Sequence, residues 1–400
     1  MTKITARLAA SARDVAQSLF SLSFNMAGLV AGALIASYFD LISTVPWALL
    51  IYPGILSIRG AIGGLFSGRV STALHIGTIK PRFTENTRYA GVLFHSITAL
   101  TLISSVAMGS VGSLFSLFVT GANALDALRI MLSVTATMGA SIVFISPITF
   151  WVSVVSFRRG LDPDIVVYPI ISTVADIVVT ACYLAMLGLV IRFPEASWWV
   201  LGLVDLVFVA FVGRRLREDM KEKDFVETIR EFLITLFFVS LIVNVTGSAL
   251  SRITESIGRR PEVYLIYPAL IDTVGDVGSM VGSTATTKMA LGLIPSRLST
   301  MRQHLGEIRS AWAASVVMFG VYSATSSLIY GLGVFRGLFL RLMVTNLLVI
   351  PVIVLISYAV AIETRRRGMD PDNFIIPIET SLSDGITTIA LLLVISLGVG

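Results

Sequence analysis

Long apolar segments run through nearly the whole chain and constrain its fold more than any other feature. Eleven stretches come close to or exceed the roughly 20 apolar residues that a membrane-spanning helix needs. They are 17–38, 47–76, 90–120, 127–156, 165–191, 197–213, 227–250, 263–293, 309–334, 338–362 and 374–399. Only 14% of the 400 residues are charged, compared with about 25% in soluble proteins. The sequence therefore predicts an all-α polytopic membrane protein, surrounded by the lipid bilayer, with about eleven transmembrane helices.

The charged residues lie in short clusters between these segments and predict an orientation. With the N-terminus placed in the cytoplasm, 20 Lys and Arg residues fall in cytoplasmic segments and seven in the opposite ones, which agrees with the positive-inside rule. We therefore expect a multi-pass protein of the plasma membrane with an extracytoplasmic C-terminus. No basic stripe is interleaved with aromatic residues, so we expect no nucleic-acid partner. The single cysteine, Cys182, excludes an internal disulfide.

The sequence contains an internal repeat. Two ungapped similar blocks begin at Tyr52 and Tyr267, 215 residues apart. A second pair of segments begins at Arg158 and Arg366, 208 residues apart, and is identical at ten of 23 positions. The identical positions include charged residues and prolines, which chance similarity between apolar segments would not bring into alignment. We therefore interpret the two copies as a true duplication.

Each copy holds five predicted spans, and the span at 197–213 connects them. We divide the chain into a first copy at 1–193, a connecting helix with a basic cytoplasmic loop at 194–225, and a second copy at 226–400. Five spans plus the connecting one make an even number, so both copies enter the membrane from the same side. The sequence thus predicts parallel five-helix repeats related by an axis along the membrane normal. The interface shared by the two copies would then lie on the axis of the molecule.

Two aspartates occupy equivalent positions in the last predicted span of each copy. Ionisable residues inside a span are costly unless they face water or a partner, which makes these aspartates functional candidates. Each follows two hydroxyl residues by three and four positions, so hydroxyls and carboxylate share one helical face. Such oxygen ligands suit a hard divalent cation, Mg²⁺ or Ca²⁺. The predicted metal ligands are Asp176, Asp384, Ser172, Thr173, Thr380 and Ser381.

Prolines and glycines also recur at equivalent positions of the two copies. They predict close helix packing, which we favour, or a lining of the pore axis. These residues are Pro53, Pro268, Gly60, Gly275, Pro169 and Pro377.

Three further charged residues fall inside the second span of a copy. Asp272 and Asp276 lie one helical turn apart in the second copy, and Arg59 lies at the corresponding depth in the first. We consider two interpretations: a charge pair between Arg59 and one of these aspartates, or a second cation site. Glu379, which precedes Asp384 in the last span, is a further candidate, and an apolar residue stands at its position in the first copy.

Two other functions compete with cation binding by paired aspartates. Two membrane aspartates could form an intramembrane aspartyl protease, but neither lies in a Gly-x-Gly-Asp or Tyr-Asp sequence. A symmetric pair also suits an ion path better than an acid–base dyad. The other alternative is a secondary transporter of another cation or small solute. A further alternative is that either aspartate is purely structural, with its carboxylate paired to a nearby Arg or hydroxyl or kept protonated.

At these residues the chain resembles the MgtE-type magnesium channels and transporters, and most of all their tandem-repeat solute-carrier relatives. The last span of that family reads Pro-x-x-[Ser/Thr]-[Ser/Thr]-x-x-Asp, which matches 169–176 and 377–384. The second span of the solute-carrier relatives contains a small-Arg-x-Ser-Thr segment, matched by 68–72 but not in the second copy. The family's Gly-Asn pair in this span is missing, since Ala61 and Asp276 follow the glycines.

The resemblance implies a function for the whole chain. It implies a transporter or channel for a divalent metal cation, with Mg²⁺ as the bound and transported ion, and no enzymatic activity. The ion would be held between Asp176 and Asp384 on the pseudo-twofold axis. The resemblance covers nearly the whole chain, so the single polypeptide would take the place of the bacterial dimer.

Overall fold

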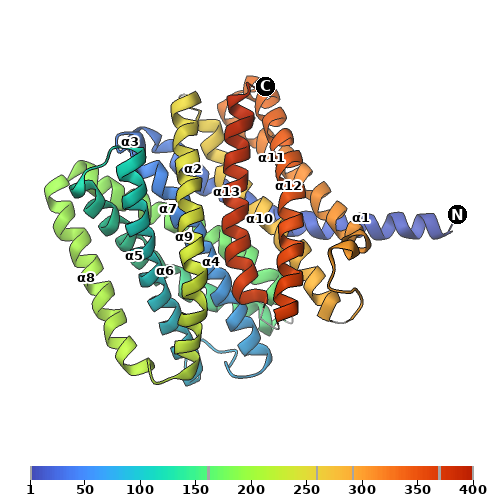
Figure 1. Ribbon diagram of the computed structural model, residues 1–400, viewed down its shortest axis with the longest axis horizontal. Helices are drawn as coiled ribbons and strands as arrows, with labels where there is room; N and C mark the ends of the chain where they lie inside the picture. The colour runs from blue at the N-terminus through green and yellow to red at the C-terminus, as the bar shows by residue number, and fades with distance from the viewer. Residues whose placement is uncertain (1, 160–162, 258–259, 291, 368–370, 399–400) are drawn as a thin grey trace. The chain divides into compact units, whose positions relative to one another are not determined.

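The computed structural model describes residues 2–159, 163–257, 260–290, 292–367 and 371–398. Every element in these ranges is helical (Figure 1). The α-helices are α1 (Thr2–Ser23), α2 (Gly28–Ser37), α3 (Phe39–Ser43), α4 (Ala48–His75), α5 (Arg88–Val119), α6 (Ala124–Arg158), α7 (Pro163–Arg192), α8 (Pro194–Asp219), α9 (Lys223–Ile257), α10 (Pro261–Ala290), α11 (Leu305–Tyr330), α12 (Gly333–Arg367) and α13 (Pro371–Ser396). Two 3-10 helices are η1 (Phe24–Ala27) and η2 (Leu298–His304).

A helix overlaps each of the eleven predicted spans, and this confirms the all-helical membrane class. Among the described residues, eight helical stretches are long and apolar enough to cross a membrane. Two further stretches, Leu241–Leu250 and Thr380–Ser396, are apolar but shorter. The chain is therefore a multi-pass membrane protein, while eleven crossings remain a prediction.

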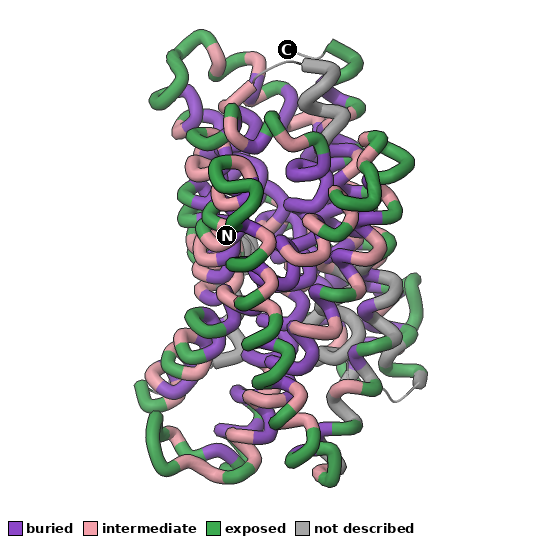
Figure 2. The backbone as a smooth tube through the Cα atoms, turned by 90° about the vertical axis from the view of Figure 1, so that its left-hand side faces the viewer, coloured by how far each residue is buried: buried purple, intermediate pink, exposed green. Residues whose placement is uncertain are grey.

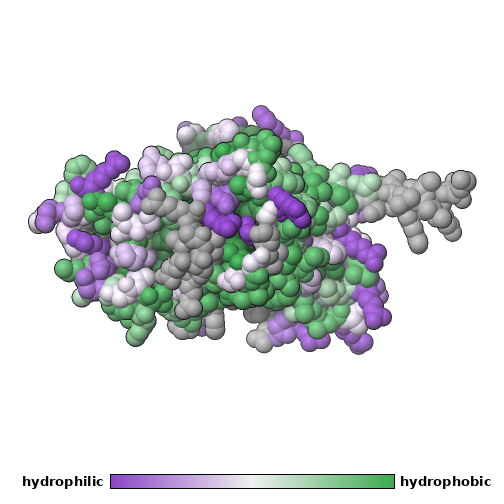
Figure 3. All heavy atoms as spheres, turned by 90° about the horizontal axis from the view of Figure 1, so that it is seen from above, coloured by the Kyte–Doolittle hydropathy of each residue, from purple (hydrophilic) through white to green (hydrophobic). Residues whose placement is uncertain are grey.

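The surfaces of these helices are those of lipid-facing helices. In α8, Trp199, Leu203 and Leu206 are 83%, 62% and 64% exposed, which would be a strong aggregation liability in water. Seen from above, and so along most of the helices of Figure 1, the molecule presents hydrophobic side chains with hydrophilic groups gathered in patches among them (Figure 3). An apolar exterior of this kind is stable only in a bilayer.

Local sequence signals account for several helix boundaries. The side chain of Asn123 accepts from the backbone N–H of Asp126, and the carboxylate of Asp126 accepts from the N–H of Asn123. This reciprocal pair is a capping box, which begins α6. Thr87 caps α5 by accepting from the N–H of Ala90. Inside the spans, Pro53 of α4 is tolerated because neighbouring helices surround it.

The helices form two compact units. One unit comprises 34–251, and the other comprises 1–33 together with 252–400. In the first, α4 packs against α5, α6 and α7, and 94% of its most apolar stretch is buried. In the second, α10 packs against α11, α12 and α13. Figure 2 shows buried stretches along the helices and exposed residues in the terminal loops.

These units do not follow the sequence ranges predicted for the repeats. The N-terminal helices up to Ala33 belong to the unit that contains α10–α13, where α1 contacts α11 and η1 contacts α10. Most of α9, which begins the second copy, belongs to the unit that contains α4–α7. The first predicted span of each predicted copy therefore belongs to the unit that holds the remaining spans of the other copy.

Two glycines mark this exchange at equivalent positions. A Cβ atom on Gly32 would lie 1.8 Å from the carbonyl oxygen of Leu265, and one on Gly247 would lie 1.6 Å from that of Leu50. Gly32 and Gly247 are 215 residues apart, as are Leu50 and Leu265. The two crossings are thus the same contact made twice, and backbones this close require glycine.

Candidate cation site

The first predicted aspartate lies in α7, within the unit formed by 34–251. Asp176 is 4% exposed, Thr173 is also buried, and Ser172 is partly buried. Ser172 and Thr173 precede Asp176 by four and three residues in α7, a spacing that places residues on one face of a helix. The site in this unit thus consists of a buried acidic group and two hydroxyls inside a span.

The second predicted aspartate lies in α13, within the other unit. Asp384 is 3% exposed, Ser381 is fully buried, and Thr380 is partly buried. A Cβ atom on Gly275 of α10 would lie 3.2 Å from the hydroxyl oxygen of Ser383. The glycine therefore allows α10 to approach α13 at the residue next to Asp384.

A tyrosine–threonine hydrogen bond fixes each aspartate-bearing helix to the second span of its copy. The hydroxyls of Tyr52 and Thr180 are 2.9 Å apart, and those of Tyr267 and Thr388 are also 2.9 Å apart. Each threonine follows the aspartate by one helical turn, and Thr388 also donates to the carbonyl of Asp384 at 2.6 Å. Both bonds are buried, so they hold the aspartates in the same setting in the two units.

The secondary candidates in α10 form a different cluster. The Asn25 amide of η1 donates to the carboxylate of Asp276 at 2.8 Å and to the hydroxyl of Thr273 at 3.4 Å. The Thr273 hydroxyl is 2.7 Å from that of Tyr322 in α11. The carboxylate of Asp276 therefore faces η1, whereas Gly275 faces α13.

Arg59 is almost completely buried in α4, at 1% exposure. Its Nε and Nη1 atoms make no hydrogen bond within the described residues. Pairing with Asp272 or Asp276 stays a prediction, and Asp276 already has a partner in Asn25.

The remaining predicted residues divide into two groups. Pro53 is buried in α4 and Gly60 is partly buried there, while Pro268 and Gly275 are buried in α10. Pro169 lies in α7, and Pro377 and Glu379 lie in α13, but their side chains are outside the described part of the chain. The lining role of these residues is therefore untested.

Sequence reasoning missed the residues that support the site. Tyr52 and Tyr267 begin the repeated blocks, and Thr180 and Thr388 are the last identical pair of the second repeat, so a signal was present. Asn25 gave no such signal, because Ser240 stands at the equivalent position. Its role depends on the exchange of first spans, which the repeat pattern does not reveal.

Comparison with known proteins points to one family. The family model MgtE, described as a divalent cation transporter, matches residues 52–186 and again 267–394. These two matches cover more than half of the chain, and one lies within each of the two predicted copies.

Two further comparisons add little. A search of curated proteins gave no match. A crystal structure of a eukaryotic MATE transporter is 12% identical and covers 98% of this chain and 96% of its own, with a TM-score of 0.21. A similarity that low assigns no fold.

Proposed function

The chain belongs to the MgtE family of divalent cation transporters, and on that premise we propose that it carries Mg²⁺ between Asp176 and Asp384. The observation that supports this most is the equivalent setting of two buried aspartates. Each lies one helical turn before a threonine whose hydroxyl is hydrogen-bonded to the tyrosine that begins the repeated block, Tyr52 or Tyr267. Two carboxylates would balance the charge of one divalent cation.

The chemistry of the side chains fits a hydrated ion. Mg²⁺ gives up its water reluctantly and usually keeps several water ligands. Carboxylates and hydroxyls inside a span can hold such waters by hydrogen bonds, and Ser172, Thr173, Thr380 and Ser381 supply hydroxyls beside the carboxylates. The ion is transported cargo in this proposal, and the protein performs no covalent step.

We further propose that the two five-helix copies are parallel and that α8 connects them. The charge bias of the loops supports a cytoplasmic N-terminus, an extracytoplasmic C-terminus and insertion in the plasma membrane. The duplicated family match supports a monomer that acts as an internal pseudo-dimer.

Flux through proteoliposomes tests the proposed site. We expect Asp176→Asn and Asp384→Asn each to reduce Mg²⁺ influx, followed with an internal Mg²⁺ dye, by about tenfold or more, since altering even the groups that support metal ligands costs about 10–100-fold. Asp205→Asn in α8 is the matched control, since it removes a membrane aspartate outside the motif. Imposed Na⁺ and proton gradients separate a channel from an exchanger. Full activity in both motif variants would refute the site.

A further inference from the structure

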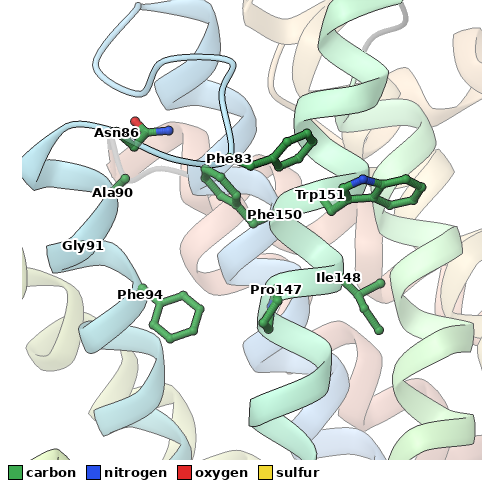
Figure 4. A pocket seen from close by; sticks show the side chains of 9 residues that line it. All are labelled: Phe83, Asn86, Ala90, Gly91, Phe94, Pro147, Ile148, Phe150 and Trp151. Carbon is green, nitrogen blue, oxygen red and sulfur yellow. The ribbon is translucent and has the colours of Figure 1, made fainter.

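An apolar groove lies between α5, α6 and the loop that precedes α5. Its volume is about 660 Å³, within the range of protein sites that hold small molecules. Figure 4 shows Phe94 extending from α5 toward α6, and Phe83 extending from the loop toward Trp151 of α6. The lining residues are Phe83, Asn86, Ala90, Gly91, Phe94, Pro147, Ile148, Phe150 and Trp151.

The loop at the rim of the groove is held in place by its own hydrogen bonds. The Asn86 amide group donates to the carbonyls of Lys80 and Arg82, and its oxygen accepts from the N–H of Lys80. Thr87 donates to the carbonyl of Thr78 at 2.6 Å. Asn86 is the one polar side chain of the lining, and its amide group is already hydrogen-bonded to the backbone of the loop. The groove therefore offers an apolar ligand a preformed site.

The rim of the groove is positively charged. The guanidinium of Arg158 donates to the carbonyl of Pro81 at 2.6 Å and stacks over the ring of Phe83 at 5.6 Å. Exposed basic residues of the same loop and helix ends are Lys80, Arg82, Arg88 and Arg159. Among the described residues the acidic side chains in this region are Glu85 in the loop, Glu222, which pairs with Arg88 at 2.5 Å, and Asp219, which lies 2.6 Å from the ring of His95 in α5. The basic residues are in excess.

The position of the groove is that of a bilayer interface. Arg88 begins one candidate span and Arg158 ends the next. A groove at these ends opens toward acyl chains on one side and toward headgroups at the basic rim. Trp151 is 55% exposed here, as is common for tryptophan at the membrane–water interface.

The equivalent place in the second copy is built differently. Tyr358 stands at the position of Phe150, 208 residues on, and Ala359 at that of Trp151. Tyr358 is fully buried, and its hydroxyl is 2.9 Å from that of Thr300 in η2. At this position the loop of the second copy therefore docks directly on its helix, through a residue that differs from Phe150 of the first copy.

We propose that this groove binds one anionic phospholipid of the adjacent leaflet. Its acyl chain lies along Phe94, Pro147 and Trp151, and its phosphate lies at Arg82 and Arg158. Apolar lining selects the chain, and the excess of basic residues selects the negative headgroup. This inference does not depend on the proposed cation site.

Fluorescence quenching of Trp151 tests the proposal. The full chain is reconstituted in phosphatidylcholine vesicles that contain a small fraction of dibrominated phosphatidylglycerol, and in matched vesicles that contain dibrominated phosphatidylcholine instead. The difference between wild type and Trp151→Phe isolates Trp151 from the other four tryptophans. We expect phosphatidylglycerol to quench Trp151 more strongly and at lower mole fraction. Equal quenching by both lipids would show an ordinary annular contact and overturn the proposal.

Two variants locate the lipid. A Cβ atom on Gly91 meets no atom within 4 Å, so Gly91→Leu fills the groove without a backbone clash and should abolish the preferential quenching. Gly188→Leu, also at an open position, is its control. Arg82→Gln should weaken the preference for phosphatidylglycerol by about fivefold, the effect of one basic residue near an anionic surface. An unchanged preference in both Gly91→Leu and Arg82→Gln would refute the site.

Discussion

The hydrogen bond between Asn25 and Asp276 shows how this protein accommodates a carboxylate inside a span. Asn25 is fully buried, Asp276 is 8% exposed, and the amide donates to the carboxylate at 2.8 Å. Hydrogen bonds to charged groups are stronger than neutral ones, because the charged partner is costly to leave unsatisfied in an apolar setting. Asn25 therefore stabilises an acidic residue that α10 could not bury alone.

We expect Asn25→Leu to lower the free energy of unfolding by about 1.5–3 kcal/mol. A double-mutant cycle with Asp276→Leu should show coupling, since the second substitution removes the group that the first leaves unsatisfied. Denaturant titration of the purified protein in detergent micelles measures both quantities. If the two substitutions are simply additive, the bond does not stabilise the unit as we describe.

At the scale of the helices, close approach of backbones decides which span packs where. Leu265 and Leu50 each present a carbonyl oxygen to a glycine of a first span, and those glycines belong to the other copy of the repeat. Within a membrane the hydrophobic effect does not favour one apolar partner over another, so small residues and shape select the contact. Gly32 and Gly247 thus direct the exchange of first spans.

Gly32→Ala and Gly247→Ala should each destabilise the protein by at least about 3 kcal/mol, because the added methyl group would meet backbone rather than a movable side chain. Gly188→Ala serves as the control, since its Cβ meets no atom within 4 Å; we expect it to be neutral or to stabilise α7 by about 0.5–1 kcal/mol. Thermal unfolding midpoints in detergent compare all three. Unchanged midpoints for both crossing glycines would argue against the exchange.

At the scale of the whole molecule, the all-helical membrane class could be predicted from the sequence, but little of the helix packing could. Apolar length predicted a multi-pass membrane protein, which the apolar helices and the family match support, while the division into two copies stays a prediction. The exchange of first spans was not predicted, because Gly32 and Gly247 look like any small residues in apolar segments. Asn25 was missed because Ser240 stands at the equivalent position of the second copy and because its partner Asp276 lies 251 residues away.

We propose that a single ion site is formed by aspartates from both copies of the repeat. Two aspartates in two separate pathways would contribute independently to flux, whereas two ligands of one ion act as a unit. This claim depends neither on the groove between α5 and α6 nor on the cluster around Asp276.

Mg²⁺ influx into proteoliposomes that contain wild type, Asp176→Asn, Asp384→Asn or the double variant tests that claim most directly. We predict that each single variant loses most of the flux and that the double variant is no worse than either one. The claim is contradicted if each single variant keeps about half of the wild-type flux and only the double variant loses it, as independent pathways require.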